Sequence, residues 1–216
     1  TEDNFLFIRN GVDLSMRDRE IDKSATLEMF SANQDTPVIL MVSRLAGWKR
    51  IDRGIDLVAD LMTQYPKIKL IVVGDGECRS ELVEHAKTMG VTGKVLFADS
   101  QPREIVTSLM KSCDIFLSLY DVSNCGNPLF EALMCGIPII TLNNGSTSSV
   151  IRDRVNGLLI EPDDNSGLFS ATLELCENKL KPGGRIVIGV ILIETLYSVL
   201  QTIEKLKFNS VDITQI

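Results

Sequence analysis

The sequence is poor in groups that usually bind metals or act as general bases. Its 216 residues include one histidine and five cysteines. The cysteines are scattered, with none of the paired spacings typical of zinc sites or redox dithiols, so we expect reduced thiols in a cytosolic protein. The single histidine, His85, lies mid-helix among charged side chains, which favours a solvated surface position over a catalytic one. We therefore expect no metal and no cofactor.

Basic character and long apolar runs are also lacking. The net charge of −7 argues against nucleic-acid binding, which needs a basic face. No apolar run is long enough to span a bilayer, and the polar, acidic start of the chain does not resemble a signal peptide. With 44% hydrophobic and 24% charged residues, the composition favours a soluble globular domain with a sizeable core.

Apolar runs of strand length alternate with amphipathic helical segments along most of the chain. This alternation predicts an α/β fold with a doubly wound, Rossmann-like parallel sheet. Gly74 and Gly76 lack the third glycine of a dinucleotide-binding motif, so a tight turn is the favoured interpretation there. The predicted strands are 38–42, 70–74, 95–97, 115–120 and 137–141, and the predicted helices are 79–89, 102–111 and a segment after Asn127.

The segment 123–131 is the most informative stretch. It follows a strand buried on both faces and predicts a turn that leads directly into a helix. Asn127 is a good N-cap and Pro128 fits the first helical position, while Cys125 and Gly126 leave the preceding backbone uncrowded. The free N–H groups and positive dipole end of such a helix bind phosphate. An ordinary strand-to-helix loop capped by Asn127 remains the alternative.

A second strand, 38–42, leads into a loop that carries two cations. Arg44 is followed after four residues by Lys49, and Gly47 lets the loop between them bend tightly. Two cations at the carboxyl end of one strand suit a diphosphate, whereas solvated loop charges are the alternative. Glu131, one turn into the helix of the first segment, is placed to reach sugar hydroxyls beside that phosphate. The pattern therefore favours a nucleotide or nucleotide-sugar site.

These segments occur in an order and spacing that resembles the family 4 (group 1) glycosyltransferases, which are retaining enzymes of GT-B fold. The similarity covers about residues 5–164 and matches the C-terminal, donor-binding domain of that fold. It implies transfer of a hexosyl group from a nucleoside-diphosphate sugar to a glycan, lipid or other acceptor. The segments that carry the resemblance are 44–49, 73–77, 127–136 and 155–162, with 8–13 similar to the family's linker.

The resemblance assigns roles to single residues. In the family, an arginine and a lysine spaced like Arg44 and Lys49 bind the donor diphosphate and stabilise it as it leaves. The backbone amides from Asn124 to Asn127 would hold phosphate or sugar oxygens. The turn 99–102 matches the loop that flanks the nucleotide base, so Gln101 is a candidate for backbone contact. The resemblance implies no metal.

Two glutamates separated by seven residues also mark the family. Glu131 matches the second, which holds the ribose hydroxyls, whereas the first falls on Ser123. The family's acid at that position contacts the transferred sugar, so Ser123 leaves the identity of the sugar open. Asp121 lies two residues earlier, but its spacing does not support a substitution for the missing acid. A nucleotide-binding module without transfer activity is therefore an alternative function.

The two ends of the chain differ from its centre. We interpret 1–13 as a linker-like entry segment, 14–166 as the donor-binding domain and 167–216 as an atypical extension of helix, strand, helix and strand. Residues 178–216 resemble the tail of class I, cobalamin-pathway methyltransferases, so a methyltransferase fragment is a third, weaker interpretation. The expected partners are a nucleotide-sugar donor, the acceptor-binding N-terminal domain that these residues lack, and a membrane surface contacted peripherally by a full-length enzyme.

Overall fold

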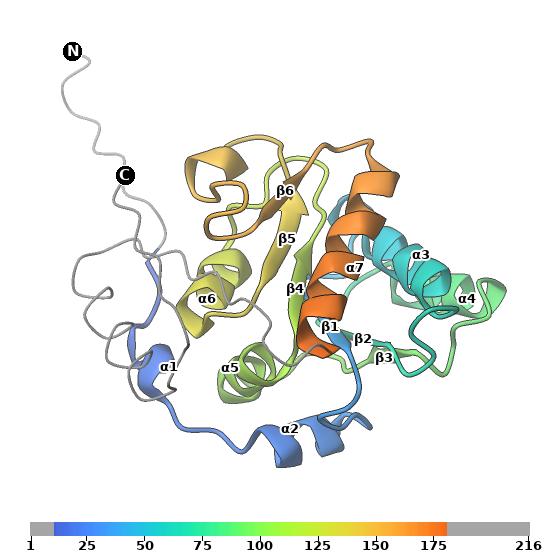
Figure 1. Cartoon of the computed structure of the whole chain (residues 1–216), viewed down its shortest axis with the longest axis horizontal. Coiled ribbons are helices and arrows are strands. Elements are labelled where there is room, and N and C mark those ends of the chain that lie inside the picture. The colour runs from blue at the N-terminus through green and yellow to red at the C-terminus, as the bar shows by residue number, and fades with distance from the viewer. Residues whose placement is uncertain (1–10, 181–216) are drawn as a thin grey trace.

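The computed structural model describes residues 11–180. Within that range, a six-stranded parallel sheet of order β3-β2-β1-β4-β5-β6 is flanked by helices on both faces (Figure 1). The strands are β1 (Val38–Val42), β2 (Lys69–Val73), β3 (Val95–Phe97), β4 (Ile115–Ser118), β5 (Ile139–Leu142) and β6 (Leu158–Ile160). The helices are α1 (Ser15–Asp18), α2 (Lys23–Met29), α3 (Ile51–Leu61), α4 (Arg79–Thr88), α5 (Arg103–Ser112), α6 (Asn127–Cys135) and α7 (Asn165–Leu180).

Each strand is a short apolar run, as a sheet covered on both faces requires. In β1 the side chains alternate between two cores: Ile39 and Met41 pack on one side, Val38 and Leu40 on the other. Helices α3, α4 and α7 contribute to the first core, and α2, α5 and α6 to the second. The predicted doubly wound α/β fold is confirmed.

The strand order reverses between β1 and β4. Strand β1 pairs with β2 on one side and with β4 on the other, and the remaining strands continue outward from this pair. The connections after β1 and β4 run to opposite faces, because α3 packs in one core and α6 in the other. In such sheets, ligands usually bind at the carboxyl edge beside the point where the strand order reverses. The segments 43–50 and 119–126 lie at this point, and the Asp121 N–H joins them by donating to the Trp48 carbonyl at 3.0 Å.

The five predicted strands are all present, with bounds shifted by no more than two residues. The sequence does not predict β6, which has three residues and too little length for a clear pattern. Helix α7 packs on α3 and on strands β5 and β6. None of the helices in residues 11–180 combines the length and apolar character needed to cross a membrane. The interpretations placed on 1–10 and 181–216, including most of the methyltransferase-like tail, lie outside the described residues.

Candidate functional site

The chain leaves β1 through a loop whose sharp turn lies at Arg50. Arg50 adopts a left-handed conformation, with φ 52° and ψ 44°, directly after the 3₁₀ helix Gly47–Lys49. The prediction that Gly47 makes the bend is wrong, because its φ is not positive and a Cβ at this position would meet nothing within 4 Å. Gly47 instead leaves open space at the start of the turn that carries Lys49.

Arg44 lies at the start of the same loop, on a backbone held by the loop after β2. The N–H of Leu45 donates to the Asp75 carbonyl at 2.9 Å, and the Leu45 carbonyl accepts from the N–H of Cys78 at 3.0 Å. The Arg44 side chain is exposed, and its Nη2 lies 3.0 Å from Oε2 of Glu77. An exposed ion pair of this kind contributes little to stability, so Arg44 can turn toward an anion at small cost.

Gly74 and Gly76 are required by the close packing of the loops after β1 and β2. A Cβ on Gly74, whose φ is +135°, would lie 1.9 Å from the Ser43 carbonyl oxygen. A Cβ on Gly76 would lie 2.5 Å from the Leu45 carbonyl oxygen. The tight-turn interpretation of this glycine pair is therefore confirmed. The contact also fixes the backbone on both sides of Arg44.

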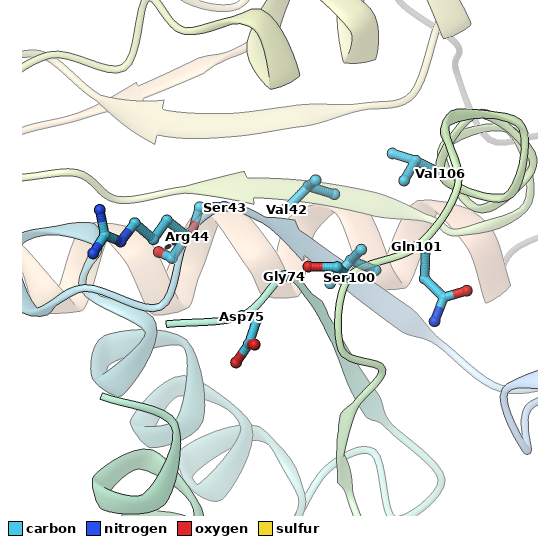
Figure 2. A pocket seen from close by; sticks show the side chains of 9 residues that line it. Val42, Ser43, Arg44, Gly74, Asp75, Ser100, Gln101 and Val106 are labelled. Carbon is cyan, nitrogen blue, oxygen red and sulfur yellow. Dashed lines mark hydrogen bonds between the residues drawn. The ribbon is translucent and has the colours of Figure 1, made fainter. Parts of the chain in front are cut away.

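A pocket of about 320 Å³ opens at the carboxyl ends of β1 and β2. Figure 2 shows Gln101 and Val106 at one end of this pocket and the Arg44 side chain at the other. The Gln101 side chain donates a hydrogen bond from Nε2 to the Ala98 carbonyl, so it braces its own loop. The pocket is lined by Val42, Ser43, Arg44, Val73, Gly74, Asp75, Ser100, Gln101 and Val106.

The Lys49 side chain reaches from the β1 loop to the end of β4. Its Nζ lies 3.4 Å from the ring centroid of Tyr120 and 3.9 Å from that of Trp48. Burial lowers the pKa of Lys49. Arg44 and Lys49 therefore share one loop but have different surroundings. The Arg44 side chain is exposed beside a carboxylate, and the Lys49 side chain is half-buried against aromatic rings.

The loop after β4 folds around the buried side chain of Asn124. Its Oδ1 accepts hydrogen bonds from Ser118 Oγ at 2.7 Å and from the Tyr120 N–H at 2.9 Å. Its own backbone N–H donates to Oγ1 of Thr147 at 3.1 Å. The prediction that the Asn124 amide holds phosphate is therefore wrong for this structure, because that N–H is buried and already bonded. Asn124 shapes the loop.

A second loop, which follows β5, holds the β4 loop in place, although no sequence motif selected it as part of the site. Asn144 donates from Nδ2 to the Tyr120 carbonyl at 2.6 Å and accepts at Oδ1 from Asn124 Nδ2 at 2.9 Å. Gly145, with φ +54°, packs so closely that a Cβ would lie 2.7 Å from Cβ of Ser123. The Asn-Asn-Gly sequence signals a turn, but only the pairing of β4 with β5 brings this turn beside the site.

Helix α6 begins one residue earlier than predicted. Gly126, in an extended conformation with φ −97° and ψ 167°, is the N-cap, and no side chain among the described residues caps the helix. Asn127 is thus the first helical residue, which corrects its assignment as N-cap and moves Pro128 to the second helical position. The extended backbone of Gly126 lets its carbonyl accept from the N–H of Leu129 at 3.0 Å.

Some of the backbone amides that the sequence predicts to bind phosphate instead donate hydrogen bonds within the β4 loop. The Gly126 N–H donates to the Asn124 carbonyl at 2.8 Å, and the Cys125 N–H to Ser123 Oγ at 3.4 Å. The second bond is long and therefore weak. Asn127 is exposed, and an N–H in the first turn of a helix has no intrahelical partner. Anion binding at this helix end therefore depends on the Asn127 amide and the weakly held Cys125 amide.

Glu131 lies one turn into α6, on the side of α5. Its side chain is 16% exposed, and Oε1 lies 3.6 Å from Nε of Arg103. Burial raises the pKa of Glu131, and the nearby Arg103 charge opposes that shift. Arg103 begins α5, directly after the Gln101 loop, and its Nη1 also lies 3.7 Å from Oδ2 of Asp13. Glu131 is therefore joined to the start of α5, although neither it nor Arg103 lines the pocket. The sequence did not single out Arg103.

The position of the missing family acid is occupied by a hydroxyl group. Oγ of Ser123 lies 3.4 Å from Oγ of Ser146. Asp121, the nearby acid in sequence, has its Oδ1 3.2 Å from Nη1 of Arg50, which also pairs with Asp52 at 3.0 Å. Asp121 is therefore paired with Arg50 of the β1 loop. This agrees with the spacing argument that Asp121 does not replace the missing family acid.

His85 lies away from this site, on α4. It is less solvated than predicted, because its Nε2 lies 2.7 Å from Oδ1 of Asp56 on α3 and its side chain is 33% exposed. In the described part of the chain, no three His, Cys, Asp or Glu side chains are grouped so that they could hold a metal ion. The expectation that the site works without a metal or cofactor stays a prediction.

The fold and the position of these loops agree with a comparison against known families. The sequence model of the family described as "Glycosyl transferases group 1" matches residues 22–182. The chain belongs to this family. The match continues through α7, beyond residue 164 where the resemblance was expected to end. Nothing in the comparisons supports the methyltransferase interpretation of the tail.

Several characterised proteins and solved structures are similar to this group 1 glycosyltransferase chain. The N-acetyl-alpha-D-glucosaminyl L-malate synthase of Bacillus anthracis is 25% identical over 73% of the chain and 41% of its own length. A GDP-mannose-dependent mannosyltransferase of Mycolicibacterium smegmatis, which acts on phosphatidylinositol monomannoside, is 26% identical over 76% of the chain and 45% of its own length. The chain thus spans less than half of these relatives.

The structure of Anabaena HepE in complex with UDP and glucose matches the model with a TM-score of 0.71. The match covers 89% of this chain and 56% of HepE, with 21% sequence identity. At this level of identity the similarity shows the fold alone. That fold is the Rossmann-like half expected from the GT-B resemblance.

Proposed function

We propose that the chain is the donor-binding part of a retaining glycosyltransferase that transfers a hexosyl group from a nucleoside-diphosphate sugar. The observation that carries the proposal is the meeting of two loops at the switch point of the sheet. The β1 loop brings Arg44 and Lys49, and the β4 loop leads into the first turn of α6. Two cations and a helix N-terminus on neighbouring loops at this edge of the sheet suit a diphosphate.

The neighbouring groups fit the remaining parts of a nucleotide. The pocket between the carboxyl ends of β1 and β2 extends from Arg44 to Gln101, which suits a base at the Gln101 end and phosphates at the Arg44 end. Glu131 follows on α6 as a largely buried acceptor for ribose hydroxyls. During transfer, Arg44, Lys49 and the α6 amides would stabilise the negative charge of the departing diphosphate.

The relatives support a nucleotide-sugar donor without selecting one. The Mycolicibacterium enzyme is GDP-mannose-dependent and HepE binds UDP, so both nucleotides are candidates for this chain. A glycan or lipid acceptor would be held by an N-terminal domain, and peripheral contact of a full-length enzyme with a membrane fits a lipid acceptor. We propose that no metal takes part, since two cations already face the diphosphate.

Calorimetric titration of the 216-residue chain with UDP, GDP and S-adenosylmethionine tests the proposal. We expect binding of one or both nucleoside diphosphates and no heat of binding from S-adenosylmethionine. The corresponding monophosphate, UMP or GMP, should bind more weakly than UDP or GDP, because it offers one phosphate fewer to the two cations. Binding of S-adenosylmethionine alone would instead support the methyltransferase interpretation.

A nucleotide-binding module without transfer activity is the second candidate. The observation that favours it is the hydroxyl of Ser123 at the position of the family's sugar-contacting acid, with Asp121 committed to Arg50. The two candidate functions predict different effects of the sugar on ligand affinity. A module specialised for nucleotide would bind UDP and UDP-glucose equally, whereas a donor site would distinguish them.

Glu131→Gln is expected to weaken UDP binding about fivefold, because ribose hydroxyls then meet a neutral acceptor in place of a carboxylate. Ser123→Ala should leave UDP binding nearly unchanged, because its bond to the Cys125 N–H is weak, and should mainly alter the affinity for UDP-glucose. Calorimetry with both ligands on both variants measures the difference. The placement of the motif on α6 is wrong if Glu131→Gln lowers only the stability of the helix. It is also wrong if both variants lose the same affinity for UDP and for UDP-glucose.

A further inference from the structure

Trp48 and Tyr120 place the ammonium group of Lys49 against two aromatic rings. The Lys49 Nζ lies 3.4 Å from the Tyr120 ring centroid and 3.9 Å from the Trp48 ring centroid. The two rings meet edge to face, with centroids 5.9 Å apart and planes at 74°, so they form a corner around the cation. Ring quadrupoles attract a cation in such a corner.

The acids in the neighbouring loops are paired with another cation. Arg50 binds Asp52 through Nη2 at 3.0 Å and Asp121 through Nη1 at 3.2 Å. Burial alone lowers the pKa of Lys49, with no acidic neighbour raising it. In the described residues, no carboxylate forms an ion pair with Lys49. The Lys49 charge is therefore held by aromatic faces and remains available to an incoming anion.

The aromatic corner is itself anchored to both central strands. The Tyr120 hydroxyl donates to the Val42 carbonyl at the end of β1, at 3.0 Å. The Tyr120 N–H donates to Oδ1 of Asn124 at 2.9 Å, and the Trp48 carbonyl accepts from the Asp121 N–H at 3.0 Å. These bonds join the β1 loop to the β4 loop. The position of the Lys49 ammonium thus depends on how the two loops are joined.

We propose that Trp48 and Tyr120 are positioning residues, which hold the Lys49 ammonium without an acidic partner at the place where a donor diphosphate binds. The inference rests on the proposed function, in which Lys49 contacts the diphosphate. An ammonium group has three N–H donors, so some can face a phosphate while the rings cover its other side. Without the rings, the long Lys49 side chain would have to be ordered during binding, which lowers affinity.

Trp48 gives the sharper test because it is 47% exposed, whereas Tyr120 is 3% exposed and belongs to the core. Trp48→Leu keeps apolar bulk and removes the aromatic face; Trp48→Phe keeps a face. Calorimetry with UDP on the full chain should show about tenfold weaker binding for Trp48→Leu and near wild-type binding for Trp48→Phe. Thermal unfolding should be nearly unchanged in both, since the side chain is half-exposed.

A double-mutant cycle with Lys49→Met separates positioning from direct contact. If Trp48 acts through Lys49, Trp48→Leu weakens UDP binding in the wild-type background and has no further effect when Lys49 is methionine. Equal losses in both backgrounds would mean that Trp48 touches the nucleotide itself, which overturns the positioning role. Tyr120→Phe keeps the ring that faces Lys49 and removes one of the bonds between the two loops, so it should weaken UDP binding less than Trp48→Leu does.

The outcomes also separate this inference from the proposed function. If Lys49→Met weakens UDP binding while Trp48→Leu binds as wild type does, the positioning role is wrong and the diphosphate site stands. If Lys49→Met itself binds UDP like wild type, the diphosphate assignment fails and the inference fails with it. Loss of UDP binding in Trp48→Phe equal to that in Trp48→Leu would also overturn the inference, because an aromatic face would then not be what matters.

Discussion

Lys49→Ala is expected to weaken UDP binding about tenfold to a hundredfold, and Arg44→Ala by a similar factor, while the fold stays intact. Lys49 presents a half-buried ammonium with no ion-pair partner in the described residues. Arg44 gives up only an exposed contact with Glu77 when it turns to a phosphate. Each lost contact is a charge-assisted one. Calorimetry at one fixed, low salt concentration measures both losses.

The control for this prediction is Lys87→Ala. Lys87 is exposed on α4, and within residues 11–180 it pairs only with Glu84 in the same helix, at 3.2 Å. Its removal changes the net charge of the chain by the same amount as removal of Lys49 or Arg44. If all three variants bind UDP with wild-type affinity, the loop charges are merely solvated. If all three weaken it equally, the attraction is general and no site exists at this loop.

Asn124→Ala is expected to lower the free energy of unfolding by about 2–4 kcal/mol. Asn124 is fully buried and its Oδ1 accepts from Ser118 Oγ and the Tyr120 N–H. Alanine would leave both donors buried without this acceptor, and Nδ2 would no longer donate to Asn144. Urea denaturation followed by circular dichroism measures the loss.

The matched control is Asn127→Ala, three residues further along the same segment. Asn127 is exposed and makes no side-chain cap bond, so its replacement should change stability by less than about 0.5 kcal/mol. The sequence pattern, with Asn127 as N-cap, would instead predict a loss of about 1 kcal/mol for this variant. Similar losses in Asn124→Ala and Asn127→Ala would contradict the hydrogen-bond arrangement of the loop.

Much of the candidate site was accessible from the sequence because its signals are local. Arg44 and Lys49 follow directly on an apolar strand, and Glu131 lies one turn into a helix that begins after a turn. Two neighbouring asparagines, one in the β4 loop and one at the start of α6, were harder to separate. Asn124 and Asn127 have the same side chain and lie three residues apart, and only the structure shows that the first is buried and organises the loop while the second faces solvent.

The sequence by itself determined the alternating strands and helices, the strand ends that carry charge and the family, because these depend on apolar runs, turn residues and spacing. Only the tertiary structure decided which side chains meet. Parallel pairing of β1 with β4 brings Tyr120 beside Lys49, and pairing of β4 with β5 brings Asn144 beside Asn124. Contacts between residues far apart in sequence follow from strand order and register, which no local pattern encodes.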